Sequence, residues 1–212
     1  HAPLDLVMEI ARRHDGNFAE NVLVIADDSH GVGALGETGR GTEEHAGGAA
    51  VDLLVATLGK SLGVNGGYVT GSQTFIDYLR ETSPFYVYSN PITPGEAVAA
   101  KTALDILDSP RGTDLLSHLR AMTARFRTGL AALGFESLEG DHPVVPLMVR
   151  DTTRTTDLVR HLRAQGILAT GLNYPVVPRG DEEIRFQISA DHTAADIDQA
   201  LSALGAWPGR LQ

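Results

Sequence analysis

The sequence predicts an α/β fold divided into two domains, and three observations support this prediction. Short apolar runs typical of buried strands end in polar or glycine-rich loops. Stretches with apolar residues three and four apart, typical of amphipathic helices, alternate with these runs. The length of 212 residues suits one to two domains with a buried core. A Ser-Pro-Arg-Gly break at residues 109–112 places the boundary between residues 1–108 and 109–212.

The first domain is expected to open on a helix and then to alternate strands and helices. Pro3 stands where a first helical turn tolerates proline, and Leu6 and Ile10 follow at helical spacing. The continuous apolar run Val22–Ala26 is typical of a buried parallel strand. The other expected elements are strands at residues 53–57 and 67–70 and helices at residues 73–80 and 94–107.

The second domain is expected to combine a long helix with a small sheet. Apolar residues from Leu115 to Leu133 recur in steps of three and four, and Gly134 closes the helix that they predict. A final helix is expected after Thr193, a good N-cap. Its buried face is expected to carry Ile197, Leu201 and Leu204. The remaining expected elements are strands at residues 144–149, 167–170 and 184–189 and a helix at residues 155–165.

Composition excludes several classes of function. Lys plus Arg number 17 and Asp plus Glu number 27, so the net charge of −10 argues against nucleic-acid or membrane-surface binding through general basicity. The absence of cysteine excludes disulfides, cysteine-ligated zinc, iron–sulfur clusters and a cysteine nucleophile. No run approaches the ~18 apolar residues of a membrane-spanning helix, and no signal-peptide pattern opens the chain. We therefore expect a cytoplasmic protein without nucleic-acid or membrane partners.

Two glycine motifs resemble phosphate-binding sites without matching them. Gly31–Gly36 has the G-x-G-x-x-G spacing, but a dinucleotide site needs these glycines where a strand turns directly into a helix. Four polar residues separate the strand from Gly31, and Gly39 and Gly41 oppose a helix there. A glycine-rich active-site loop is therefore favoured. Gly59-Lys60-Ser61 resembles the end of a P-loop, but Leu54 stands where that motif begins with glycine.

Three polar residues at strand ends are candidates for chemistry. Lys60 could be an ordinary surface lysine, but it follows an apolar strand between small neighbours, where a lysine held in an apolar layer can form an imine. Asp27 and His30 follow another strand at the edge where parallel α/β sheets bind ligands. A helix cap or a loop salt bridge would also explain them. A metal site with Asp28 is a further alternative, although no third ligand has recognisable spacing, so no metal is expected.

Five segments, in order along the chain, carry a resemblance to a known family. They are Ala26-Asp-Asp-Ser-His-Gly-Val-Gly33 with Gly36-Glu-Thr-Gly-Arg-Gly41, Thr57-Leu-Gly-Lys-Ser-Leu-Gly63, Tyr88-Ser-Asn-Pro91, Gly171–Gly180 and Ile184–Thr193. The chain resembles the α-oxoamine synthases, which are pyridoxal-phosphate enzymes of fold type I. The resemblance implies part of the large mixed-sheet α/β domain in residues 1–108 and the small C-terminal α+β domain in residues 109–212.

The resemblance assigns roles around the cofactor, pyridoxal 5'-phosphate. Lys60 would bind the cofactor as an imine and later remove the α-proton of glycine. Asp27 would pair with the pyridine nitrogen and keep it protonated, so that the ring accepts electrons. His30 would hydrogen-bond the phenolic oxygen of the ring, and Thr57 would contact the phosphate.

The resemblance also implies a second subunit and a substrate anchor. Ser89 and Asn90 match a segment that reaches the cofactor phosphate of the neighbouring subunit, which implies a homodimer with a shared cofactor site. Arg185 matches the arginine that holds the carboxylate of the amino acid through a charge-assisted contact. The alternative for Arg185 is a surface residue on a strand.

Within the family, the chain most resembles members that condense glycine with acetyl-CoA to give 2-amino-3-ketobutyrate and CoA. One alternative is a member with another acyl-CoA or amino acid, such as those that make 8-amino-7-oxononanoate; an aminotransferase is more distant. A non-catalytic fragment is an alternative of a different class, because the match covers only the C-terminal half of a family chain and the sequence opens at His1 without Met. We expect this segment alone to bind cofactor weakly, to lack activity, and to leave an apolar sheet edge at Val22–Ala26.

Overall fold

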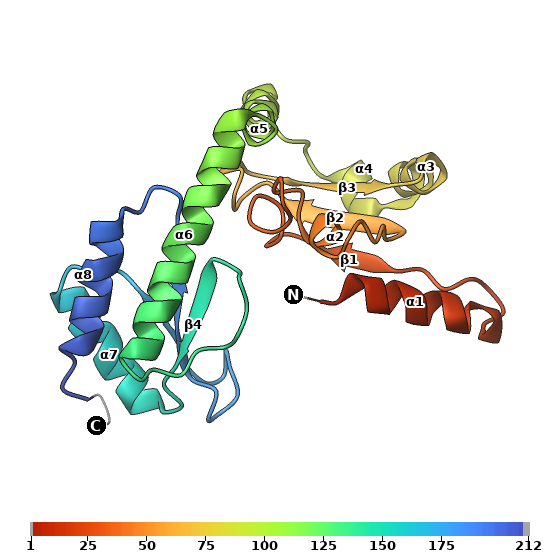
Figure 1. The fold of residues 1–212 in the computed structure, drawn as a ribbon. Helices are drawn as coiled ribbons and strands as arrows, with labels where there is room; N and C mark the ends of the chain where they lie inside the picture. Colours follow the sequence, from red (N-terminus) through yellow and green to blue (C-terminus); the bar gives the residue numbers. More distant parts are fainter. Residues whose placement is uncertain (1, 210–212) are drawn as a thin grey trace. The chain divides into compact units, whose positions relative to one another are not determined.

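The computed structural model describes residues 2–209, which form two compact units (Figure 1). The chain divides into His1–Leu116 and Ser117–Gln212, so the division falls inside helix α6 (Pro110–Ala132). The expected break at residues 109–112 is instead the start of this helix. Pro110 lacks an N–H and has a helical φ, which suits a first helical turn. Gly112 is required there, since a Cβ would overlap the carbonyl oxygen of Leu107.

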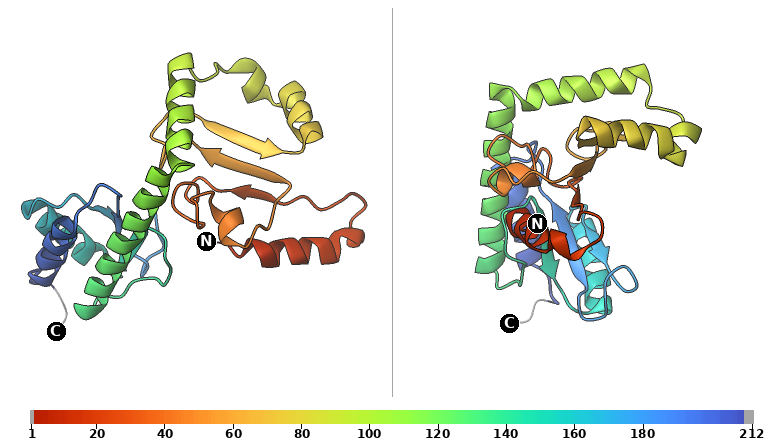
Figure 2. Two further views of the ribbon diagram at one scale, coloured as in Figure 1. Left: turned by 45° about the horizontal axis from the view of Figure 1, so that its top comes forward. Right: turned by 90° about the vertical axis from the view of Figure 1, so that its right-hand side faces the viewer.

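The first unit is a small mixed sheet with helices before, between and after its strands along the chain. Its elements are α1 (Leu4–His14), η1 (Asp15–Asn17), β1 (Ile25–Asp27), α2 (Thr42–His45), β2 (Leu53–Thr57), β3 (Gly67–Gly71), α3 (Gln73–Thr82), α4 (Pro84–Tyr88) and α5 (Pro94–Leu107). The three strands lie in the order β1-β2-β3 (Figure 2). β1 runs parallel to β2 and β3 antiparallel to it. The predicted bounds of β2 and α5 are confirmed, whereas the short helices α2 and α4 were not expected.

Strand β1 is shorter than the apolar run that predicted it. The expected strand covered residues 22–26, but the N–H of Val22 donates to Asp15 Oδ1 and the N–H of Val24 donates to Asp52 Oδ2, each across 2.7 Å. Side-chain acceptors therefore take the N–H groups that a longer strand would use in its ladder. β1 is an edge strand of the described sheet, and Ile25 is 61% exposed on it. The prediction of a buried strand is therefore wrong for the described unit, whereas the exposed apolar edge is the one that the sequence predicted.

The second unit packs three helical segments against an antiparallel sheet. Its elements after α6 are β4 (Val144–Met148), α7 (Thr152–Ala164), β5 (Thr170–Leu172), β6 (Glu183–Gln187) and α8 (Ala194–Gly205). The strands lie in the order β4-β6-β5. The largest fully buried side chains come from both layers: Phe126, Leu130, Leu147, Leu158, Leu162, Ile184 and Leu204. The combination of the mixed and antiparallel sheets with their helices confirms the predicted α/β and α+β architecture.

Two local details show how hydrogen bonds decide where elements begin. β5 starts at Thr170 rather than at residue 167, because the N–H of Ile167 closes the end of α7 on Leu162 O across 2.9 Å. α8 begins as predicted, since the Thr193 hydroxyl accepts from Asp196 N–H and the Asp196 carboxylate accepts from Thr193 N–H, forming a capping box. Within residues 2–209, no helix has the length and apolar character needed to cross a membrane.

Candidate active site

The carboxyl ends of β1 and β2 bring three of the predicted residues together. The two strands are parallel, so their carboxyl ends share one edge of the sheet. Asp27 is the last residue of β1, and Lys60 follows the end of β2 by three residues. The charges of Lys60 and His30 both act on the Asp27 carboxylate. The structure therefore places an amine, an imidazole and a carboxylate in one neighbourhood.

Ser29 keeps Asp27 ionised and ties it to the next strand. Hydrogen bonds from the Ser29 hydroxyl and N–H, the latter 2.9 Å from Oδ1, lower the pKa of Asp27. Burial raises this pKa by less, and the positive charges of Lys60 and His30 add to the lowering. The Ser29 hydroxyl oxygen in turn accepts from the N–H of Thr57 at 3.1 Å. Sequence reasoning did not single out Ser29, although its place between Asp27 and His30 was visible.

Lys60 lies on a loop whose apolar residues anchor it. Leu58, Leu62 and Val64 are buried in one cluster with Ala100 of α5. The Lys60 side chain itself is exposed on the described unit, whereas the sequence suggested that an apolar layer would surround it. Burial of the flanking residues thus fixes the backbone of the loop and leaves the amine accessible.

The Thr57 hydroxyl closes the lysine loop in this structure. It donates to the carbonyl of Gly66 at 3.1 Å and accepts from the N–H of Gly59 at 3.1 Å. A hydroxyl has one proton to donate, so a donated bond from Thr57 to a phosphate requires its release from Gly66. Ser61 also joins this loop to the glycine-rich loop, since its hydroxyl donates to Val32 O across 2.6 Å.

Two carboxylates, those of Asp28 and Glu44, hold the glycine-rich loop in place through hydrogen bonds. The sequence did not indicate this role for either of them. Asp28 is buried and accepts hydrogen bonds from both the N–H and the hydroxyl of Thr42. A Cβ at Gly31 or Gly41 would overlap its oxygens, which explains both glycines. Asp28 is therefore committed to the loop. Across the described part of the chain, no cluster of three or more His, Asp or Glu side chains could hold a metal.

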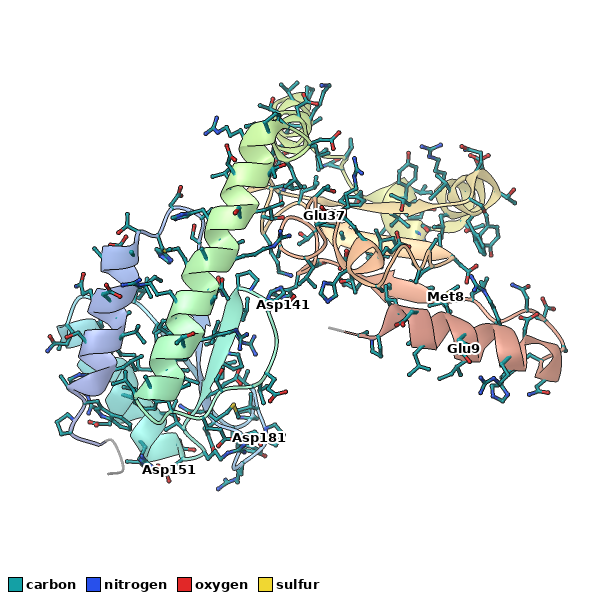
Figure 3. All side chains as sticks on the ribbon, viewed as in Figure 1. Met8, Glu9, Glu37, Asp141, Asp151 and Asp181 are labelled. Atoms are coloured by element: carbon teal, nitrogen blue, oxygen red, sulfur yellow. The ribbon has the colours of Figure 1, made fainter. Side chains whose placement is uncertain are left out.

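Glu44 performs the same task at the outer end of this loop, where Glu37 is labelled in Figure 3. Its carboxylate accepts from the N–H groups of Thr38 and Arg40 and from the Thr38 hydroxyl. Burial raises the pKa of Glu44, but these hydrogen bonds together outweigh it and lower the pKa overall. The loop carries no helix over residues 31–36, as predicted. Its glycines allow close packing instead, because a Cβ at Gly31, Gly33 or Gly36 would overlap a neighbouring side chain.

The sequence contains only two lysines, which sharpens the choice of the reactive amine. Lys60 follows a buried strand and acts electrostatically on Asp27. Lys101 lies on the outside of α5, where its Nζ pairs with Asp105 across 2.6 Å. Lys101 therefore has an ordinary helix-surface partner four residues away. Of the two lysines, Lys60 has the surroundings of a reactive group.

Ser89 and Asn90 follow the end of α4, rather than the ends of β1 and β2 where Asp27 and Lys60 lie. Both are exposed, as are the neighbouring aromatic residues Phe85 and Tyr88. The Ser89 hydroxyl donates to the carbonyl of Phe85, so it closes the end of α4. The structure brings neither residue to Asp27 or Lys60 by a described contact.

Arg185 belongs to the second unit and lies on β6. Its Nε and Nη2 donate to Glu183 Oε1 at 3.2 and 2.9 Å. Ile184 and Phe186, which alternate with it along the strand, are buried in the core. Arg185 therefore lies on the face of β6 opposite the core, paired with a carboxylate that sequence reasoning did not notice.

The comparison with protein families gives these residues a context. A family model described as aminotransferase class I and II matches residues 2–204. The chain belongs to this family. Among its relatives, the 8-amino-7-oxononanoate synthase of Marinobacter nauticus is 38% identical over 96% of this chain and 50% of that protein. The mitochondrial 2-amino-3-ketobutyrate coenzyme A ligase of Mus musculus is 37% identical over 95% of this chain and 47% of that protein.

Both relatives are α-oxoamine synthases, so the resemblance drawn from the motifs is confirmed. The chain spans about half the length of these curated relatives. Solved structures agree with the fold: serine palmitoyltransferase of Sphingomonas wittichii superposes with a TM-score of 0.86 and 26% identity, over 96% of this chain and 50% of that one. A high-resolution SPT structure with PLP has a TM-score of 0.88. The aminotransferase class I and II match and this PLP-bound structure indicate pyridoxal phosphate as the family's cofactor.

The residues at the strand ends fit this cofactor chemically. Lys60 offers an amine for the aldehyde, and His30 offers an imidazole for the phenolic oxygen. Asp27 offers a carboxylate that Ser29 keeps ionised, which suits a protonated ring nitrogen. The hydroxyls expected to bind the phosphate are engaged elsewhere in this structure, because those of Thr57 and Ser89 donate to backbone carbonyls.

Proposed function

We propose that the complete protein is a pyridoxal-phosphate-dependent α-oxoamine synthase that joins the α-carbon of glycine to the acyl carbon of acetyl-CoA. The products would be 2-amino-3-ketobutyrate and CoA. The observation that carries the proposal is the placement of Lys60 and Asp27 at the shared edge of β1 and β2. The relatives named 2-amino-3-ketobutyrate coenzyme A ligase support the choice of substrates.

Each residue of the proposed site has a separate role in this chemistry. When bound, the cofactor supplies an electron sink for negative charge at the α-carbon of the amino acid. Asp27, held ionised by Ser29, keeps the proton on the ring nitrogen. Lys60 Nζ accepts the α-proton as general base. His30 donates to the phenolic oxygen, and Arg185 binds the substrate carboxylate.

The phosphate and the second subunit complete the proposal. Thr57 would turn its hydroxyl from Gly66 toward the phosphate. Ser89 and Asn90 would reach the cofactor of a partner subunit in a homodimer. The exposure of this segment and of Phe85 and Tyr88 beside it supports a role at an interface, since adjacent exposed aromatics are typical of binding surfaces.

A second candidate is a related synthase that uses another acyl-CoA or amino acid. It is favoured by the 8-amino-7-oxononanoate synthase of Marinobacter nauticus, whose identity of 38% is similar to that of the ligase relatives. A panel of amino acids and acyl-CoA thioesters, with product analysis by mass spectrometry, separates the two. Glycine with acetyl-CoA as the best pair supports the first proposal. A longer thioester or another amino acid supports the second, and transamination alone refutes both.

A further inference from the structure

The Arg185–Glu183 pair lies on the face of β6 that points away from the core. Residues two apart on a strand share a face, and the alternate residues Ile184 and Phe186 are buried in the core. The side chain of Glu183 is only 9% exposed, whereas that of Arg185 is 42% exposed. The carboxylate is thus the buried, fixed partner, and the guanidinium is the accessible one. The labelled Asp181 in Figure 3 marks the loop that leads into this strand.

The geometry of the pair leaves one edge of the guanidinium available. Nε and Nη2 of Arg185 both donate to the same oxygen, Glu183 Oε1. A guanidinium has five N–H donors, and its Nη1/Nη2 edge can hold a second carboxylate through two parallel bonds. Among the contacts of residues 2–209, Arg185 has no other hydrogen-bond or ion-pair partner. A single acceptor therefore orients the guanidinium and leaves the edge suited to a carboxylate ligand.

We propose that Glu183 is a positioning residue that holds Arg185 with its Nη1/Nη2 edge open to the carboxylate of the amino-acid substrate. This inference rests on the proposed function of Arg185. Glu183 also weakens the attraction for that carboxylate, since it partly neutralises the guanidinium and places a second negative charge nearby. Glu183 therefore has two opposed effects on substrate binding: its hydrogen bonds orient the guanidinium and favour binding, whereas its negative charge disfavours it.

Two substitutions separate orientation from charge. Glu183→Gln keeps a carbonyl acceptor for Arg185 but removes the negative charge. We expect it to lower the KM for the amino acid by a factor of about two to five, with kcat nearly unchanged. Glu183→Leu removes the acceptor, so the guanidinium loses its orientation. We expect the KM to rise by about tenfold. A purely structural role for Glu183 predicts changes in the same direction for both variants.

One mutant background and one further variant serve as controls in the complete enzyme. In an Arg185→Ala background, Glu183→Leu should no longer raise the KM for the amino acid, because the orienting hydrogen bonds of Glu183 act through Arg185. Glu136→Gln removes the charge from the carboxylate of another arginine–carboxylate pair in the same unit, with Arg150, and should leave the KM near that of the wild type. An equal effect of Glu183→Leu with and without Arg185 overturns the proposal.

A second readout needs neither cofactor nor turnover. Nitrogen-15 NMR of the cofactor-free protein observes the Nε–H of Arg185, assigned by its loss in Arg185→Ala. We expect slow solvent exchange of this proton in the wild type and Glu183→Gln and fast exchange in Glu183→Leu; equal exchange in all three overturns the proposal. If the wild-type enzyme uses no amino acid while the NMR result is as expected, the proposed function fails although the pair is real. If the wild-type enzyme uses an amino acid and neither Glu183 variant changes the KM for it, the proposed role of Glu183 fails.

Discussion

Ser29 donates its backbone N–H to Oδ1 of Asp27 across 2.9 Å. With the bond from its hydroxyl, this contact lowers the pKa of Asp27 and leaves the carboxylate ionised at the end of β1. The same Ser29 oxygen accepts from Thr57 N–H at the end of β2. One small residue therefore fixes the charge of a candidate cofactor ligand and links two strand ends.

The first prediction concerns this contact. Ser29→Ala removes the hydroxyl bond, so the pKa of Asp27 should rise toward its ordinary value. Because the folded-state pKa is the lower one, ionised Asp27 stabilises the fold above its unfolded pKa of about 3.9. This contribution to the free energy of unfolding is lost as the pH falls through the folded-state pKa of Asp27. In Ser29→Ala the two pKa values lie closer together, so the contribution should be smaller. Carboxyl NMR titration of Asp27 measures the shift directly. Ser61→Ala, whose hydroxyl binds Val32 instead, should leave this pKa unchanged; no shift in Ser29→Ala contradicts the assignment.

The second prediction identifies the reactive lysine. The complete protein with cofactor should be yellow, and borohydride reduction followed by peptide mapping should label Lys60. Lys60→Ala should lose the visible absorbance and the label while keeping its circular dichroism spectrum. Lys101→Ala removes the only other lysine in this sequence and should keep both. Labelling at Lys101 would show that the assignment is wrong.

The third prediction concerns substrate binding by Arg185. Losing a charge-assisted pair of this kind costs about 2–5 kcal/mol, so Arg185→Ala should raise the KM for glycine by orders of magnitude. The KM for the acyl-CoA should change much less, because Arg185 is proposed to bind only the amino acid. Arg160→Ala is the matched control, since Arg160 makes only an exposed pair with Asp157 in the described structure. Steady-state kinetics with each substrate varied in turn measures both KM values. An unchanged KM for glycine refutes the proposed role of Arg185 in binding the carboxylate.

The fourth prediction tests the packing of the glycine-rich loop. Gly41 has φ +93° with ψ −156°, a combination that essentially only glycine adopts, and Gly48 has φ +85°, so alanine is strained at both, by about 1–3 kcal/mol. At Gly41 the new Cβ would also overlap a carboxylate oxygen of the buried Asp28, whereas Gly48 has open space around it. Gly41→Ala should therefore lower the free energy of unfolding by at least about 1 kcal/mol more than Gly48→Ala. Chemical denaturation of both variants measures the difference. Equal losses would mean that Asp28 moves away without cost.

The sequence by itself determined the features that depend on local pattern. The alternation of apolar runs and helical periodicity located β2, α5 and the long helix α6. Glycines at residues 39 and 41 excluded a helix in the loop at residues 31–36. Five segments, one of which carries Lys60, determined the family resemblance, because their residue types and spacing are readable without any fold.

Only the tertiary structure decided which polar group each side chain serves. The same apolar pattern that predicted a strand from Val22 could not show that Asp15 and Asp52 take its N–H groups. Nor could it show that Asp28 supports a loop while Asp27, the preceding residue, keeps its carboxylate at the strand end. The physical reason is that burial repeats with the period of a helix or strand, whereas a hydrogen-bond partner can lie anywhere along the chain. Its identity depends on distances that only the folded chain defines.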